Sequence, residues 1–139
     1  MDFVDAKTRS RMMRSVRSKN TAPEMAVRRA AHALGYRFRL HRLDLPGRPD
    51  IVFPRFRVVI FVHGCFWHSH DSCSRSSIPA TNRDFWAEKL ARNVERDQRN
   101  MEDIRNLGWR AGIIWGCETK DTERLRVLIA NILSSKSSL

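Results

Sequence analysis

The stretch RPDIVFPRFRVVIFVHG, residues 48–64, decides the fold of this chain. Two apolar runs, 51–53 and 56–62, flank a Pro-Arg pair, and this pattern predicts two short strands joined by a turn. The second run is rich in β-branched residues and almost uninterrupted, as in a central strand that is buried on both faces. Asp50 precedes the first strand and His63 ends the second, so we expect both side chains at the same edge of a sheet.

The sequence on either side of these strands predicts helices. Thr21 and Glu24 match a capping box, with Pro23 in the first turn, and the helix that they begin is expected to stop at Gly35. The other expected elements are a half-buried strand at 36–41, a long helix from Thr81 or Asn82 to Gly108, a buried strand at 109–116 and a helix at 121–133. The inward stripe of the long helix is expected to be Leu90, Val94, Met101, Ile104 and Leu107. The order α-β-β-β-α-β-α predicts an α/β fold with a mixed sheet flanked by helices.

Length and composition are those of an ordinary globular domain. A chain of 139 residues, 42% of them apolar, fits a single domain (1–139) with one hydrophobic core. No apolar run reaches the length of a membrane span and the N-terminus has no apolar signal core, so we expect an intracellular, cytoplasmic protein. In that compartment three cysteines favour metal ligation or burial over disulfides.

Charge indicates the partner. The formal net charge is +11, and the segment between Asp5 and Glu24 carries six cations and no acid. We interpret residues 1–20 as a basic arm that binds nucleic acid, because neutralised phosphates release counterions; the alternative is a merely solvated surface. An anionic membrane is disfavoured, since no clear apolar helix face accompanies the arm. Residues 134–139 are expected to form a flexible tail.

The segment HGCFWHSHDSC (63–73) and Asp50 carry the candidate catalytic groups. His63 and His68 can exchange protons near neutral pH, which suits acid–base catalysis. For each histidine alone, the alternative of a zinc ligand or a buried group is about as well supported as this catalytic role. Asp50 offers a carboxylate for magnesium, the alternative being an aspartate that caps a turn. Phosphodiester hydrolysis needs both kinds of group, and their expected clustering favours the catalytic interpretation.

The same segment contains soft metal ligands. The candidate zinc ligands are Cys65, His70, Cys73 and the distant Cys117. Together they supply what tetrahedral structural zinc prefers, and they leave the other two histidines for catalysis. The alternative is three buried thiols, which a loop rich in Ser, His and Asp makes a poor interpretation.

Aromatic residues adjoin these ligands. Phe66 and Trp67 lie on the predicted zinc-bound loop, where we expect little core to receive them. We interpret the pair, joined by Trp86, as a wedge that enters between base pairs. Packing in a core is the ordinary alternative for all three side chains.

Two levels of resemblance follow. The element order and Pro49-Asp50 at the head of a strand resemble the restriction-endonuclease-like nuclease superfamily; where that superfamily carries an acidic-x-Lys triplet, this chain has Phe61-Val62-His63. Five longer segments carry a more specific pattern: TRSRMMRSVRSKNTAPE (8–24), LPGRPDIVF (45–53), VVIFVHGCFWHSH (58–70), PATNRDFWAEKLARNVERD (79–97) and LGWRAGIIWGCE (107–118). Their succession resembles that of the very short patch repair (Vsr) DNA mismatch endonucleases. The most specific of these motifs is HGCFWH (63–68).

This resemblance implies an activity and its partners. The protein would nick one strand of duplex DNA on the 5′ side of the T in a T:G mismatch, which arises when 5-methylcytosine deaminates. The resemblance implies a restriction-endonuclease-like fold, catalytic magnesium and one structural zinc. It also implies a bacterial repair context, with a functional link to a DNA cytosine-5 methyltransferase and to mismatch-repair proteins. A monomer suffices for a single nick.

The resemblance further assigns roles to individual residues. Asp50 would ligate magnesium together with the backbone carbonyl of Val62. His68 would be the general base with Glu24 bonded to it, and His63 would assist at the scissile phosphate. The zinc ligands would be Cys65, His70, Cys73 and Cys117. The DNA contacts would be Phe66, Trp67, Trp86, Lys89, Asn93, Arg11, Met13 and Arg17.

Two features depart from the family pattern. The family has one residue between the zinc histidine and the next cysteine, whereas Asp71 and Ser72 both intervene here. Either the loop bulges or the ligand set shifts by one residue. Val62 stands where some relatives have Thr, a change that a backbone carbonyl role tolerates.

Two rival functions are distinguishable. A related restriction-type or junction nuclease would share Asp50 but would not need Phe66 and Trp67. A non-catalytic zinc- and DNA-binding module would cut nothing, and the expected clustering of Asp50 with His63 and His68 disfavours it.

Overall fold

A computed structural model describes residues 21–40, 42–70, 73 and 77–134 of the chain. The predicted basic arm, with Arg11, Met13 and Arg17, lies outside the described residues, as do residues 135–139 of the predicted tail. The elements are α2 (Ala22–Ala33), β1 (Arg39–Leu40), β2 (Ile51–Phe53), β3 (Val58–His63), α3 (Arg83–Asn106), β4 (Arg110–Trp115), the 3-10 turn η2 (Gly116–Thr119) and α4 (Thr122–Ser134). Ser134, expected in the tail, is therefore helical. The predicted α/β class, with a mixed sheet flanked by helices, is confirmed.

The four strands form one mixed sheet in the order β1-β2-β3-β4. β2 pairs antiparallel with β3, with Ile51 opposite Ile60, and β4 pairs parallel with β3 along its whole length, from Val58 to His63. The long helix α3 provides the crossover between these parallel strands, as a parallel connection requires. The antiparallel register of β2 and β3 places Asp50 and the end of β3 at the same edge of the sheet, as predicted.

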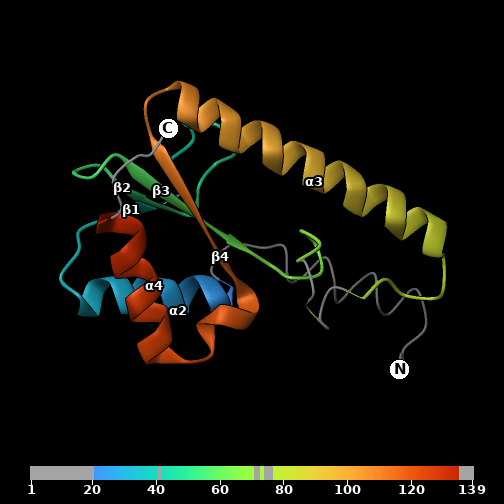
Figure 1. Ribbon diagram of the computed structural model, residues 1–139, viewed down its shortest axis with the longest axis horizontal. Helices are drawn as coiled ribbons and strands as arrows, with labels where there is room; N and C mark the ends of the chain where they lie inside the picture. The colour runs from blue at the N-terminus through green and yellow to red at the C-terminus, as the bar shows by residue number, and fades with distance from the viewer. Residues whose placement is uncertain (1–20, 41, 71–72, 74–76, 135–139) are drawn as a thin grey trace.

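Helices cover both faces of the sheet (Figure 1). On one face Ile51, Phe53, Val58 and Ile60 pack with α2 and α4, whereas Val52, Val59 and Phe61 pack with Ile104 of α3 on the other. Alternate residues of β2 and β3 thus enter two different cores, which explains why both strands read as continuous apolar runs. By the same alternation Val62 lies on the α2 side of the sheet and His63 on the α3 side.

One predicted strand length and one predicted inward residue were wrong. Within the described residues the strand expected at 36–41 is reduced to β1, and the rings of Tyr36 and Phe38 lie edge-on to Phe53, with centroids 6.2 and 6.1 Å away. Leu107, expected in the inward stripe, is 51% exposed because it caps α3, and Gly108 follows in the left-handed conformation with φ +85°. The helical period no longer applies beyond the cap.

The helix starts follow local capping chemistry. Thr21 Oγ1 accepts the N–H of Glu24 at 3.4 Å, so the predicted N-cap is confirmed. α3 is the exception: it begins after Asn82, one of the two predicted caps, which adopts a left-handed conformation with φ 57° and makes no side-chain cap hydrogen bond. Asp121 Oδ1 accepts the N–H groups of Glu123 and Arg124 at the start of α4. None of the helices in the described ranges is long and apolar enough to cross a membrane.

Candidate active site

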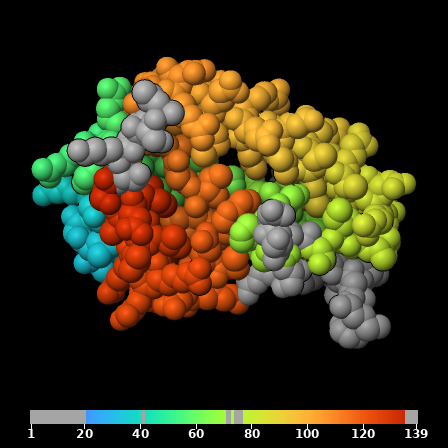
Figure 2. Space-filling view, viewed as in Figure 1, coloured from blue at the N-terminus to red at the C-terminus, as the bar shows by residue number. Residues whose placement is uncertain are grey.

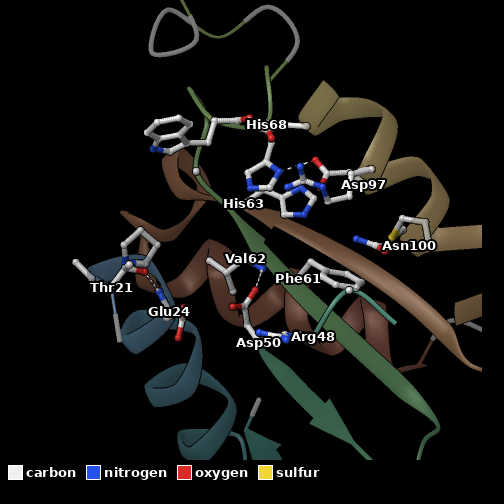
Figure 3. A pocket seen from close by; sticks show the side chains of 18 residues that line it. Thr21, Glu24, Arg48, Asp50, Phe61, Val62, His63, His68, Asp97 and Asn100 are labelled. Atoms are coloured by element: carbon white, nitrogen blue, oxygen red, sulfur yellow. Dashed lines mark hydrogen bonds and ion pairs between the residues drawn. The ribbon is translucent and has the colours of Figure 1, made fainter. Parts of the chain in front are cut away.

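The Asp50 carboxylate is held in place by the loop before β2 and by the backbone of β3. Gly47 has φ +76°, and a Cβ there would meet the Asn100 side chain of α3 at 2.8 Å, so this loop packs tightly on α3. Pro49 is buried, and Asp50 Oδ2 accepts the N–H of Val62 at 2.7 Å (Figure 3). Asp50 is thereby fixed beside the backbone of Val62, the residue whose carbonyl is the second predicted magnesium ligand.

Electrostatics at Asp50 favour a cation. The pKa of Asp50 is raised to about 7, chiefly by burial and also by the adjacent Glu24 carboxyl, while the Val62 amide and Arg28 act in the opposite direction. Glu24 is itself buried and accepts a hydrogen bond from Arg28 at 3.0 Å. A divalent cation would relieve the cost of ionising a buried carboxylate beside a second acid, so this pair fits magnesium chemically.

The two predicted catalytic histidines stack on each other. The rings of His63 and His68 lie 3.8 Å apart and are nearly parallel, at 5°. His68 Nδ1 lies 2.5 Å from Asp97 Oδ2 of α3 (Figure 3). His63 is 5% exposed, and burial, together with the neighbouring His68 and opposed by Asp97, lowers its pKa to about 4. His63 is therefore neutral at physiological pH.

One cavity brings these groups together. It has a volume of about 590 Å³ and is lined by Glu24, Asp50, His63, His68 and Asp97. These residues come from α2, from the strand ends, from the following loop and from α3, so the cavity exists only in the folded chain. The expected clustering of Asp50, His63 and His68 is confirmed.

The partner of His68 differs from the expected one. His68 pairs with Asp97, whereas Glu24 contacts Arg28 and adjoins Asp50. The alternation of β3 gives the physical reason. The histidine pair lies on the α3 side of the sheet, while Glu24 enters from α2 on the Val62 side.

Sequence reasoning missed Asp97, although a signal was present. Asp97 lies three residues after Val94 and four before Met101, so it falls within the stripe that was predicted to face inward. An acid at an inward position of a helix needs a partner, because an unpaired buried charge is costly. That rule would have pointed to a histidine beneath α3.

The four predicted zinc ligands also converge. The ligand atoms of Cys65, His70, Cys73 and Cys117 all lie within 4.8 Å of one another. Burial, then the neighbouring Cys65 and Cys73, raise the pKa of Cys117 to about 11, since clustered thiolates repel one another. A tetrahedral cation would offset that repulsion, so the donor set fits zinc. The structure brings His70 itself into the cluster, despite the extra residue before Cys73.

The aromatic residues form a small core of their own. Trp67 and Trp86 are 8% and 6% exposed and pack with Leu90, while Phe66 and Ile78 pack against this cluster. The expectation that the loop offers little core is wrong, because the first turns of α3 extend beyond the sheet and cover it (Figure 1). Phe66, Trp67 and Trp86 nevertheless lie together, as the wedge interpretation requires.

The two polar residues predicted to contact DNA border this aromatic core. Lys89 Nζ lies 5.5 Å from the Trp67 ring centroid and 5.9 Å from that of Phe85, an aromatic residue that is 55% exposed. Asn93 Nδ2 donates a hydrogen bond to the Trp67 carbonyl at 3.1 Å. Asn93 thus holds the aromatic loop against α3 in the free protein.

Comparison with known proteins points to one family. A family model described as DNA mismatch endonuclease Vsr matches residues 1–75. The type II nicking enzyme V.XorIIP of Xanthomonas oryzae pv. oryzae is 49% identical over 95% of this chain and 96% of its own length. The DNA mismatch endonuclease Vsr of Escherichia coli is 44% identical over 89% of this chain and 79% of its own length. The type II nicking enzyme V.NmeAIP of Neisseria meningitidis is 38% identical over 94% of this chain and 96% of its own length.

Proposed function

Because the chain belongs to the Vsr family of DNA mismatch endonucleases, we propose that it nicks one strand of duplex DNA on the 5′ side of the T in a T:G mismatch. The observation that carries the proposal is the shared cavity of Asp50 and the His63–His68–Asp97 group. A buried acid that favours a cation, beside an imidazole held by a carboxylate, suits metal-assisted hydrolysis of a phosphodiester.

His68 is the general base in this proposal. Asp97 accepts the Nδ1 proton of His68, which leaves Nε2 of the same ring free to take a proton from the attacking water. Asp97 then stabilises the imidazolium that forms. His63, stacked on His68 and neutral, assists at the scissile phosphate without adding a second positive charge beside His68.

Asp50 and Glu24 provide the acidic side of the cavity. When bound by Asp50 and the Val62 carbonyl, magnesium would supply positive charge against the charge that builds on the phosphate oxygens. Glu24 holds Arg28 beside Asp50 and adds negative charge that favours the cation. We therefore assign Glu24 to the magnesium side of the site rather than to His68.

The remaining features serve DNA recognition. A structural zinc on Cys65, His70, Cys73 and Cys117 would stiffen the loop that carries Phe66 and Trp67. A T:G wobble pair stacks less well than a Watson–Crick pair, so aromatic insertion there costs less. The basic arm lies outside the described residues. In this proposal it contacts DNA through Arg11, Met13 and Arg17, and the net charge of +11 supports this role.

The wider context belongs to the same proposal. The strand order and Pro49-Asp50 support a restriction-endonuclease-like core within a single domain, 1–139. Mismatches from 5-methylcytosine deamination link the protein to a cytosine-5 methyltransferase and to mismatch-repair proteins in the bacterial cytoplasm. The protein acts as a monomer, since one nick needs one active site.

Strand-specific cleavage tests the proposal. Purified protein and Mg²⁺ are incubated with end-labelled duplexes that differ only in T:G versus C:G, at a set of methyltransferase sites. We expect a single nick 5′ of the mismatched T, abolished by EDTA. Equal cutting of both duplexes would instead establish the related restriction-type or junction nuclease. Binding without cutting in Mg²⁺ and in Mn²⁺ would establish a non-catalytic module.

A further inference from the structure

We propose that His63, His68 and Asp97 form a second metal site, which takes a borderline transition-metal ion such as Zn²⁺, Co²⁺ or Ni²⁺ rather than Mg²⁺. One ligand atom from each residue lies within 4.8 Å of the other two. The site is separate from the Asp50 carboxylate and from the cluster of thiols. It adjoins both, because His63 ends β3 and the loop that follows carries three of the four zinc ligands.

The buried nitrogen of His63 is the first argument for a ligand. His63 Nδ1 is buried and has no hydrogen-bond partner within the described part of the chain. The side chain as a whole is 5% exposed. Buried polar atoms in folded proteins almost always have a partner, because the loss of water costs free energy that nothing else offsets. A metal ion bound through this nitrogen would provide the missing interaction.

The donor set is the second argument. Two imidazoles and one carboxylate are the ligands that Zn²⁺, Co²⁺ and Ni²⁺ accept, whereas Mg²⁺ prefers an all-oxygen shell. Three protein ligands also leave a coordination position for water, as in open zinc sites. The chemistry of this group therefore separates it from Asp50, which offers oxygen alone.

The geometry needs an adjustment that the loop carrying His68 permits. The rings of His63 and His68 are stacked 3.8 Å apart at 5°, and imidazole lone pairs lie in the ring plane, so the His68 ring must tilt before both rings can point at one ion. Ligand atoms around a tetrahedral Zn²⁺ lie roughly 3.3 Å apart, given bonds of about 2.0–2.1 Å. The His68 Nδ1 to Asp97 Oδ2 distance of 2.5 Å must open, and the widest separation in the group must close. His68 lies on a loop and its side chain is 26% exposed, while the Asp97 side chain is 20% exposed, so both can rotate without disturbing the sheet.

A route for the ion exists on the side away from Asp50. A second cavity of about 820 Å³ lies between α3, β4 and the loop, and His63, His68 and Asp97 line it as well as the first. Figure 2 shows the hollow beneath the middle of α3. An ion can therefore reach the three side chains from a cavity that Asp50 does not line.

Occupancy of this site has a consequence for catalysis that rests on the proposed function. The ion would take a nitrogen of His68 and the Asp97 carboxylate that orients it, so His68 would no longer act as a base. Excess transition metal is then expected to inhibit nicking even when magnesium is saturating. The proposal that a metal binds here rests on the geometry of the three side chains and does not depend on the proposed function.

Cobalt absorption tests the binding. The full-length protein, purified with its zinc, is titrated with CoCl₂ in magnesium-free buffer while the visible and near-ultraviolet spectrum is recorded. We expect one further equivalent of Co²⁺ to bind and to give d–d bands without a thiolate-to-cobalt charge-transfer band. Asp97→Asn should lower the affinity for this equivalent at least roughly tenfold, since even the loss of an outer partner of a ligand costs that much.

Matched variants keep the test decisive. Asp103→Asn removes the same charge from an exposed position of α3 and should leave the titration unchanged. His63→Gln should abolish the equivalent, and circular dichroism with thermal unfolding shows whether each variant is folded. The proposal is overturned if no further equivalent binds, if every equivalent gives the thiolate band, or if the folded variants bind like the wild type.

A separate cleavage assay tests the inhibition. Zn²⁺ beyond the structural equivalent should lower the rate of nicking at saturating Mg²⁺. Cobalt binding without inhibition would overturn the inhibitory consequence and keep the site. Absence of nicking on every duplex would overturn the proposed function, while the cobalt titration would still decide the metal site.

Discussion

The two sides of the active-site cavity are held by different kinds of structure. Asp50 and His63 lie at the ends of β2 and β3, and the register of a buried antiparallel pair brings them to one edge. His68 and Asp97 meet only because α3 packs over the loop that follows β3. A side chain placed by strand register therefore tolerates substitutions around it. A side chain placed by helix packing depends instead on several contacts that are remote in the sequence.

The largest expected effect is at Asp50, on the side set by strand register. Asp50→Ala removes the carboxylate that would offset charge through magnesium, an effect worth several kcal/mol. We expect cleavage to fall by at least about 10³-fold, with folding intact. Single-turnover cleavage of the T:G duplex measures the effect.

An exposed acid gives the matched control for Asp50. Asp44→Ala removes a carboxylate whose ion pair with Arg42 lies at the surface, so it should change neither cleavage nor stability measurably. If Asp50→Ala retained wild-type cleavage, Asp50 would be a turn residue and the magnesium assignment would be wrong.

The next effect concerns the side set by packing, the His68–Asp97 pair. His68→Ala should lower the cleavage rate roughly 10²- to 10⁴-fold, as the loss of a general base does. Asp97→Asn should lower the rate about 10²-fold, because Asn donates to Nδ1 and favours the wrong tautomer of His68.

The double variant distinguishes positioning from general structural damage. If Asp97 acts through His68, Asp97→Asn should have little further effect in the His68→Ala background. Fully additive losses in the cycle would mean that Asp97 only supports the fold of α3. Thermal unfolding of all three variants is the accompanying measurement.

The same contrast explains what the sequence could predict. The β-branched run at 58–62 and the alternating cores of β2 and β3 are local patterns, so the sheet and the meeting of Asp50 with His63 followed from them. The thiol cluster followed from ligand chemistry. The pairing of His68 with Asp97 required knowledge of how α3 crosses the sheet, which no local pattern contains.

The aromatic loop shows the same limit. Ser, His and Asp residues made the loop read as polar, and on that basis Trp67 was expected to lack a core. The covering surface comes from Trp86 and Leu90, about twenty residues further along the chain. Burial of Trp67 is therefore a property of the tertiary fold and not of the loop.

A stability measurement sharpens the comparison at this aromatic core. Trp67→Ala should lower the free energy of unfolding by about 3 kcal/mol, because it opens a cavity against Trp86 and Leu90. Phe85→Ala, at an exposed neighbouring ring, should cost within about 0.5 kcal/mol. Urea unfolding of both variants decides the matter, and equal effects would mean that Trp67 is not packed in solution.

The smallest expected effect is at Asn93, which joins α3 to the loop after β3 through the Trp67 carbonyl. Asn93→Ala should lower the free energy of unfolding by about 1 kcal/mol, the net value of one hydrogen bond. Asn131→Ala, exposed on α4, is the control and should leave stability and binding unchanged.

The DNA-binding consequence of Asn93→Ala separates its two possible roles. If Asn93 positions the aromatic loop, the variant should bind T:G and C:G duplexes with more similar affinities than the wild type, because the wedge that reads the weak stack is less well held. If Asn93 instead contacts the DNA backbone, which carries no information about the mismatch, its loss should lower the affinity for both duplexes equally. Parallel binding titrations of the two duplexes, read beside the loss of stability, therefore decide whether Asn93 acts through Trp67 or on the DNA itself.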